Sequence, residues 1–346
     1  MKKIYIVAEI GCNHNGNPEL AKKMIELAKD CGVDAVKFQT FNSNLLISKY
    51  AEKAEYQKKT TGENESQLEM TKKLELCHDD YVKLKKYAKS IGLDVFSTAF
   101  DFESINFLEK DGQNIWKVPS GEITNLPYLE RISEINIENK LIILSTGMST
   151  IEEIKRAVEI LQSKRKKRII ILHCNTEYPT PDEDVNISAI KDLQKYFPNH
   201  EIGFSDHSVG DIGAIMAVSY GITFIEKHFT LDKNFPGPDH KASATPEELK
   251  QLVNDVRRAE IIYGNEVKIV TDSERKNKKI ARKSIIAKKS IKKGDVFSED
   301  NLICKRPGNG ISPMHWYDLI GKKAEYDFDE DELIISEGIK WEEVDE

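Results

Sequence analysis

Residues 201–228 read EIGFSDHSVGDIGAIMAVSYGITFIEKH, in which two apolar strand patterns enclose one amphipathic stretch of helix length. This order predicts two neighbouring parallel strands, with His207 and His228 at their C-terminal ends. Adjacent strands lie about 5 Å apart, a separation that one metal ion can bridge. Carboxylate and hydroxyl side chains precede both histidines, so the pattern favours a metal site in a polar cleft over two buried, hydrogen-bonded histidines. A metal site at strand ends indicates an enzyme.

The same alternation extends along most of the chain. Eight near-continuous apolar segments alternate with segments of helical periodicity, as expected of a parallel sheet buried on both faces. The predicted strands are residues 4–11, 34–40, 93–100, 115–121, 140–147, 168–175, 201–208 and 222–230. Eight β/α units in about 265 residues predict a (β/α)8 TIM barrel. The alternative, an open doubly wound sheet, is disfavoured because GCNHNG at 11–16 lacks the spacing of the dinucleotide fingerprint.

The pattern divides the chain into three parts. Residues 1–268 form the predicted barrel, 269–283 a charged linker, and 284–346 a small β-rich module of short strands and turns. Within the barrel, residues 41–76 are far longer than a usual βα connection, so we expect them to fold over the barrel mouth.

Composition excludes several classes of partner. The net charge of −7 argues against binding to nucleic acid or to an anionic membrane surface. No apolar run approaches the roughly 20 residues that a membrane-spanning helix needs. The five cysteines show neither a CxxC nor a disulfide spacing, which favours reduced thiols and a cytoplasmic location.

Polar residues at the C-terminal ends of the predicted strands are the candidate site residues, because TIM-barrel sites lie at that face. Two lysines and several hydroxyls from different strands would form a cradle for phosphate or carboxylate. The candidates are Glu9, Lys37, Gln39, Thr98, Lys117, Ser120, Glu122, Ser145, Thr146, Asn175, Thr176, Tyr178, Ser205, His207, Glu226 and His228, followed by Asp239 and His240.

The motifs resemble those of the sialic acid synthase family, most of all bacterial N-acetylneuraminate synthases. Their order and density make the resemblance specific over nearly the whole chain. The matching motifs are AEIGCNHNG, VKFQT, ESQLEMTKKLEL, PSGEITNLPYLE, LSTGM, HCNTEYPTP, GFSDHS, FIEKHFTLDK, GPDH and ARKSIIAK. The tail, IKKGDVFSEDNL followed by KRPGNGISP, resembles the family's antifreeze-like (SAF) domain.

This resemblance implies condensation of phosphoenolpyruvate (PEP) with N-acetylmannosamine and water, giving N-acetylneuraminate and phosphate by C–O cleavage. It also implies a divalent metal, typically manganese with magnesium or cobalt as alternatives, held by His207 and His228. Glu9 would position or deprotonate the attacking water, with Glu226 near the metal. The implied PEP-binding residues are Lys37, Thr98, Lys117, Ser120, Ser145 and Ser205.

The resemblance also assigns the sugar side and a partner. Gln39, Tyr178 and Asp239 would face the sugar, together with Asn64 in the long segment. Family members are homodimers in which the SAF domain covers the partner's barrel, so Arg306 would reach the N-acetyl group of the sugar from the partner. Where some members read HCTN, this chain has HCNT, which leaves the phosphate-side role open between Asn175 and Thr176.

Three other functions compete with this one. A synthase for legionaminic acid or another nonulosonic acid would share the PEP chemistry and use a different N-acylated hexose. A metal-dependent aldolase would use pyruvate and release no phosphate. A non-enzymatic ice- or glycan-binding role for the C-terminal module would leave the polar strand ends of the barrel unexplained.

Overall fold

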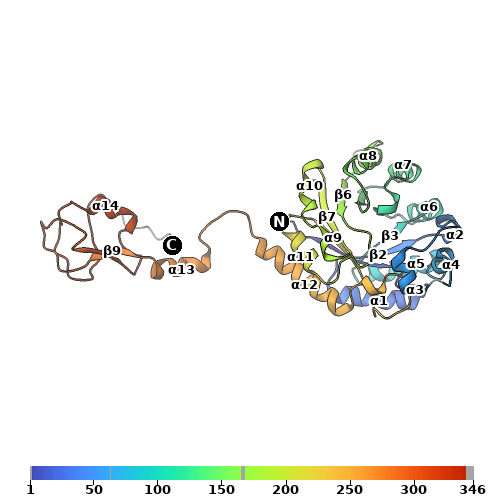
Figure 1. Ribbon diagram of the computed structural model, residues 1–346, viewed down its shortest axis with the longest axis horizontal. Coiled ribbons are helices and arrows are strands. Elements are labelled where there is room, and N and C mark those ends of the chain that lie inside the picture. Colours follow the sequence, from blue (N-terminus) through green and yellow to red (C-terminus); the bar gives the residue numbers. More distant parts are fainter. Residues whose placement is uncertain (1, 63, 165–167, 340–346) are drawn as a thin grey trace. The chain divides into compact units, whose positions relative to one another are not determined.

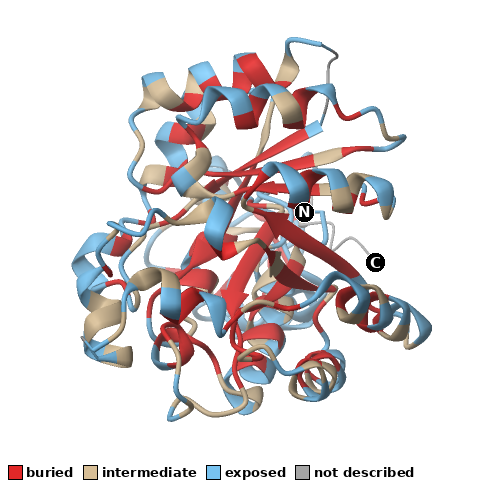
Figure 2. Cartoon of the chain, turned by 90° about the vertical axis from the view of Figure 1, so that its right-hand side faces the viewer, coloured by how far each residue is buried: buried red, intermediate tan, exposed pale blue. Residues whose placement is uncertain are grey.

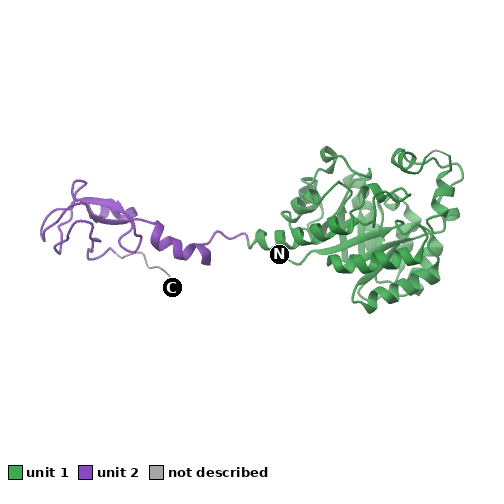
Figure 3. Cartoon of the chain, turned by 90° about the horizontal axis from the view of Figure 1, so that it is seen from below, with its two compact units in different colours: residues 1–265 green, residues 266–346 purple. Residues whose placement is uncertain are grey.

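The computed structural model of the chain describes residues 2–62, 64–164 and 168–339 (Figure 1). The backbone divides into two compact units, Met1–Asn265 and Glu266–Glu346 (Figure 3). The first unit contains the eight predicted barrel strands, and the second contains the β-rich module. Within the described residues, no helix is both long enough and apolar enough to span a membrane.

The first unit is built on eight parallel strands in the order β3-β2-β1-β8-β7-β6-β5-β4. β3 and β4, at the two ends of this order, contact one another, although their described residues form no hydrogen-bonded ladder. The sheet is therefore a near-closed TIM-like barrel, which confirms the predicted fold. Its strands are β1 Tyr5–Gly11, β2 Ala35–Thr40, β3 Asp94–Ala99, β4 Ile115–Val118, β5 Leu141–Ser145, β6 Arg168–His173, β7 Glu201–Asp206 and β8 Phe224–His228.

Helices cover the outer face of this sheet (Figure 1). Their ends follow ordinary capping chemistry: the Asn17 side chain accepts hydrogen bonds from two amides of α1, and Gly32 ends that helix with a φ of +86°. The helical elements of this unit are α1 Pro18–Cys31, α2 Ser43–Leu46, α3 Glu55–Thr61, α4 Gln67–Lys72, α5 His78–Ser90, α6 Phe102–Lys110, η1 Ser120–Glu122, α7 Leu126–Glu134, α8 Ile151–Gln162, α9 Asp182–Val185, α10 Ala189–Tyr196, α11 Ile212–Val218, η2 His240–Ala242 and α12 Pro246–Tyr263.

The barrel has an apolar layer on each face of its strands. The strands are buried along most of their length, while the helices bury one side (Figure 2). An inner cluster, which includes Val7, Phe96 and Phe224, fills the barrel interior. A β-carbon at Gly203 would lie 2.5 Å from a methyl of Leu172 and 2.8 Å from the Phe224 carbonyl oxygen. Glycine at this position therefore allows Leu172 and Phe224 to pack closely in the inner cluster.

The long segment after β2 is partly helical, since its described residues include α2, α3 and α4. Its start is tied both to the barrel and to the C-terminal end of the segment itself. The Asn42 amide donates to an Asp101 carboxylate oxygen over 2.8 Å, and the Ser43 amide donates to Glu75 over 2.7 Å. These bonds fix the segment at the C-terminal end of the barrel, where it lines a cavity.

The second unit has its own small core. It contains α13 Asp272–Ala281, the antiparallel strands β9 Ser284–Ala287 and β10 Leu302–Lys305, η3 Pro313–His315 and α14 Trp316–Leu319. Ile285, Phe297 and Leu302 belong to its buried cluster. The stretch predicted as a charged linker thus carries a helix, whose first turn is closed by a capping box between Thr271 and Glu274.

Candidate active site

A cavity of about 470 Å³ opens at the C-terminal ends of the barrel strands. This volume is within the range of small-molecule sites. Most of the sequence-predicted site residues line it together. They are Glu9, Lys37, Gln39, Thr98, Lys117, Ser120, Glu122, Ser145, Thr176, Tyr178, Ser205, His207, Glu226, His228 and Asp239.

The floor of this cavity is a buried cluster of opposite charges, formed by Glu9, Lys37, Lys117 and Glu226. The Lys37 Nζ lies 3.2 Å from Glu9 Oε2 and 3.3 Å from Glu226 Oε2. The Lys117 Nζ donates to Glu226 Oε1 over 2.9 Å. Gln39 donates to the other oxygen of Glu9 over 3.0 Å. The two lysines and the two glutamates therefore form a closely paired charge cluster.

Strand geometry explains why these side chains meet. Alternate residues of a strand point to the same face. Val7 of β1 points into the barrel, and Glu9, two residues later, therefore points inward as well. Glu9 is paired in register with Lys37 on β2 and with His228 on β8. The apolar residues of the same inward rows lie deeper and form the inner cluster. The barrel interior is thus apolar at depth and charged at its C-terminal end.

The two carboxylates of the floor have opposite electrostatic environments. Burial raises the pKa of Glu9 to about 7, and the charge of Glu226 adds to this shift, although Lys37 opposes it. Glu226 is buried too, which would raise its pKa, but Lys117 and Lys37 bring that pKa below its usual value. One carboxylate therefore stays ionised while the other exchanges a proton near neutral pH.

His207 and His228 lie on neighbouring strand ends with ring centroids 5.2 Å apart, which confirms their predicted pairing. The His207 Nδ1 is bonded to the Asn175 carbonyl oxygen. Because that oxygen only accepts, Nδ1 carries the proton and the lone pair is on Nε2. The His228 Nδ1 is buried without a hydrogen-bond partner among the described residues. Burial lowers the pKa of His207 to about 4, so its ring is neutral at pH 7.

Hydroxyl groups surround the charged floor. The Lys37 Nζ donates to Thr98 Oγ1 over 3.2 Å, and Ser205 Oγ donates to Glu226 over 3.0 Å. Ser120 Oγ accepts from the Gly147 amide over 3.0 Å. A β-carbon at Gly147 would lie 2.6 Å from Thr176 and 2.9 Å from Ser120 Oγ, so this close approach needs glycine.

Tyr178 and Asp239 form another side of the cavity. The Tyr178 ring lies 4.2 Å from the His207 ring and 5.3 Å from the His228 ring. Burial raises the pKa of Asp239 to about 6, an effect that a hydrogen bond from Cys12 opposes. The Cys12 Sγ is 3.6 Å from Asp239 Oδ2. Among the described residues this weak donor is the one hydrogen-bond partner of the Asp239 carboxylate, so the carboxylate can accept from a donor on a ligand.

Five predicted residues do not line the cavity: Asn64, Thr146, Asn175, His240 and Arg306. The Thr146 hydroxyl donates to the Leu172 carbonyl over 2.8 Å, and the His240 Nδ1 is hydrogen-bonded to Thr230 Oγ1 over 2.7 Å. The Asn175 side chain accepts from the Glu177 amide over 2.7 Å, and the residue acts on the cavity through its carbonyl bond to His207. Asn64 is exposed and does not line the cavity. Arg306 belongs to the second unit, where its Nε donates to the Ala281 carbonyl over 3.1 Å. Its role at the barrel stays a prediction.

The covering wall of the cavity comes mainly from the long segment, and sequence reasoning did not identify its residues. The unusual length of the segment was the only signal for it. The residues of this covering wall are Phe41, Leu46, Ile47, Tyr56, Gln57, Gln67, Met70, Thr71 and Leu74. Cys12 also lines the cavity.

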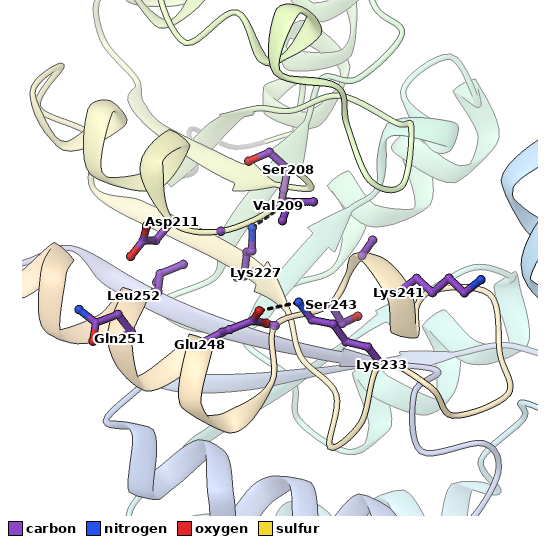
Figure 4. Close-up of a pocket in the computed structure, with 13 residues that line it drawn as sticks. Ser208, Val209, Asp211, Lys227, Lys233, Lys241, Ser243, Glu248, Gln251 and Leu252 are labelled. Atoms are coloured by element: carbon purple, nitrogen blue, oxygen red, sulfur yellow. Dashed lines mark hydrogen bonds and ion pairs between the residues drawn. The ribbon is translucent and has the colours of Figure 1, made fainter.

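A second cavity of about 210 Å³ lies between the loop after β7 and the start of α12 (Figure 4). Two of its lysines are already paired. The Lys227 Nζ donates to the Ser208 carbonyl over 2.6 Å and to Asp206 over 2.9 Å, and Lys233 pairs with Glu248 at 2.6 Å. None of the sequence-predicted site residues lines it.

A near-closed barrel whose strand ends carry charged groups and two histidines around one cavity is the architecture of a TIM-barrel enzyme. The sequence profile of the NeuB family matches residues 24–268, and that of the SAF domain matches residues 282–336. The chain belongs to the NeuB family.

Named relatives describe the chemistry of this family. An N,N'-diacetyllegionaminic acid synthase from Campylobacter jejuni is 50% identical over 96% of this chain and 99% of its own length. A synthase of the same name from Legionella pneumophila is 41% identical over 92% of this chain and 90% of its own length. The crystal structure of a sialic acid synthetase from Leptospira borgpetersenii, in complex with citrate, has a TM-score of 0.69 at 34% identity, covering 80% of this chain and 90% of that one.

Proposed function

We propose that the protein is an N,N'-diacetyllegionaminic acid synthase, which condenses PEP with a di-N-acetylated hexose and water and releases phosphate. The observation that carries this proposal is the buried Lys37–Glu9–Lys117–Glu226 cluster beside the histidine pair. The 50% identity to the Campylobacter jejuni synthase supports this product over N-acetylneuraminate. PEP contains no nitrogen, so both acetamido groups of the product must come from the sugar.

The floor offers what PEP requires. PEP carries a carboxylate and a phosphate, and Lys37 and Lys117 supply two buried positive charges surrounded by hydroxyls. Ser120, Ser145 and Thr176 would add donors for the phosphate oxygens. Both lysines are paired with the two glutamates, and they would bind the PEP anion in addition to these partners.

In the proposed reaction, C3 of PEP attacks the aldehyde carbon of the open-chain sugar and forms the new C–C bond. Water then adds to C2, and its proton passes to the Glu9 carboxylate, whose pKa of about 7 suits this exchange. The C2–O bond to phosphate breaks last, and phosphate leaves with the bridging oxygen. The C2 hydroxyl proton passes to the departing phosphate as the keto group forms, and the alkoxide of the former aldehyde takes the proton that Glu9 holds, so protons and charge balance.

A divalent metal is part of this proposal, and the histidine pair fits one. The His207 Nε2 lone pair and the unpartnered Nδ1 of His228 are the donors that the chain offers, and both lie in a neutral, buried pair. Among the described residues no cluster of three or more metal-ligating side chains exists, so open positions would remain for substrate. When bound, the metal would polarise the aldehyde oxygen as a Lewis acid.

The test is phosphate release from PEP with each candidate sugar. A di-N-acetylated hexose should give the highest kcat/KM, and N-acetylmannosamine, the expectation from sequence, should give a lower one. With PEP labelled by heavy oxygen at the bridging position, the label should appear in phosphate. Turnover of pyruvate, or a preference for N-acetylmannosamine, would contradict the proposal.

A homodimer with a site completed by the partner's Arg306 is proposed on the basis of the family resemblance. The guanidinium would hydrogen-bond an acyl oxygen of the sugar. Lysine would be a poor substitute, because it lacks the planar arrangement of N–H donors of the guanidinium. Arg306→Lys should therefore raise KM for the sugar more than KM for PEP. Mixed with inactive His207→Ala protein, inactive Arg306→Ala protein should recover part of the activity. If subunits exchange and no activity returns, the site is complete within one chain.

A further inference from the structure

Tyr56 connects the covering wall to the aromatic residues around the histidine pair. It lies on α3, and its ring is 5.3 Å from the ring of Tyr178, with a tilt of 35°. Tyr178 in turn contacts the rings of His207 and His228. A sugar whose aldehyde lies at the histidines would therefore extend past Tyr178 toward Tyr56.

The surroundings of Tyr56 make its hydroxyl a hydrogen-bond donor. Burial raises the pKa of Tyr56, and the nearby charge of Asp239 raises it further. The hydroxyl thus keeps its proton at any working pH. Asp239 is the neighbouring acceptor, so this end of the cavity offers one donor and one acceptor close together.

The rest of this wall combines amide groups with apolar side chains. Gln57 and Gln67 line the cavity beside Met70 and Leu46. The Gln57 oxygen accepts from the Ala54 amide over 3.0 Å, which fixes the side chain against α3. An acetamido group presents a methyl, a carbonyl and an N–H, and it matches such a mixed surface better than a hydroxyl does.

We propose that Tyr56 is a specificity-determining residue that receives the second acetamido group of the sugar, the group that N-acetylmannosamine lacks. This inference rests on the proposed function. The ring packs against the acetyl methyl, and the phenolic hydroxyl donates to the acetyl carbonyl. A sugar with a hydroxyl in that place leaves the ring face and the donor unmatched, so it binds less well.

The test compares two sugars in two variants. Tyr56→Phe removes only the hydroxyl, and Tyr56→Leu removes the ring as well. Tyr56→Phe should lower kcat/KM for the di-N-acetylated hexose about tenfold, as expected for one lost hydrogen bond, and leave N-acetylmannosamine nearly unchanged. Tyr56→Leu should lower the preference further. KM for PEP should stay at the wild-type value in both.

Tyr50→Ala is the matched control, because Tyr50 belongs to the same segment, is exposed and does not line the cavity. It should keep the wild-type preference. If both Tyr56 variants lose activity equally on the two sugars, or keep the wild-type preference, the inference is wrong. If the wild-type protein itself fails to use the di-N-acetylated hexose, the proposed function is wrong and this inference falls with it.

Discussion

The floor and the covering wall of the same cavity are built in different ways. Floor residues such as Glu9 and His228 stand on paired strands, so the register of the sheet sets their positions. Wall residues such as Tyr56 and Met70 stand on short helices of a long connection and are placed by side-chain contacts. The floor carries the groups that can take part in the reaction, and the wall carries groups that can only bind the substrate.

This difference extends to the hydrophobic core. Among the described residues of the segment 41–76, Leu76 alone belongs to the large core cluster around the barrel. The wall can therefore change in sequence or position with little effect on the stability of the barrel. Substitutions in the floor should abolish turnover, while substitutions in the wall should change which sugar is used and how tightly it binds.

The largest effect is expected from His228→Ala. Losing one of the two proposed metal ligands should lower kcat by about 1,000-fold or more, because a Lewis acid contributes several kcal/mol of transition-state stabilisation. Elemental analysis should show loss of the divalent metal, and circular dichroism should show an unchanged fold.

His78→Ala is the control for this variant, since His78 is exposed at the start of α5 and stacks on Phe107. It should keep metal and activity. Full activity of the wild-type protein after exhaustive removal of metal ions would refute a catalytic metal and reduce the histidine pair to a packing role.

The same contrast explains what the sequence could predict. The period-two alternation and the apolar strand runs place Glu9, Lys37, Lys117 and Glu226 at one face, because a parallel barrel brings all strand ends to one end. Their ion pairs and the raised pKa of Glu9 depend on distances of a few ångströms across the barrel, and local pattern does not encode them.

The positions of the wall residues cannot be predicted from sequence patterns, for a physical reason. Short helices in long connections are positioned by tertiary contacts, such as the one between Tyr56 and Tyr178, and carry no periodic signal. The motif match placed Asn64 at the sugar, and the structure leaves that residue exposed. The motif match also left the phosphate-side role open between Asn175 and Thr176. Of these two residues, Thr176 lines the cavity.

An intermediate effect is expected at Asp239, which precedes η2 and lines the cavity together with residues of the floor and of the wall. Its pKa of about 6 means that the carboxylate is ionised above pH 6 and protonated below it. As an acceptor for the sugar it should work only when ionised, so kcat/KM for the sugar should rise as pH increases through about 6. Asp239→Asn should lower this parameter about tenfold at pH 7.5, as expected for a charged hydrogen bond.

The pH dependence supplies the decisive comparison for this residue. In Asp239→Asn the rise in kcat/KM near pH 6 should disappear, and KM for PEP should keep its wild-type dependence on pH. A variant that retains the rise would show that another group titrates there.

The smallest effect is expected at Lys53, whose side chain connects several residues of the long segment that forms the wall. Its buried Nζ donates to Thr61 Oγ1 over 3.0 Å and to the Gly62 carbonyl over 3.1 Å, and it lies 3.5 Å from Glu65. Lys53→Met keeps the aliphatic stem and removes these contacts, so the C-terminal end of α3 should loosen. KM for the sugar should rise about three- to tenfold, corresponding to one or two net hydrogen bonds, while kcat and KM for PEP change little.

Lys49→Met is the matched control, because Lys49 is exposed in the same segment and contacts only the Tyr50 ring among the interactions described. It should bind both substrates as the wild-type protein does. Limited proteolysis should cut the segment faster in Lys53→Met than in Lys49→Met, with no difference in the melting temperature of the barrel. A fall in kcat as large as that of a floor variant would mean that the wall also positions the reacting groups, and the division between reaction and recognition would then fail.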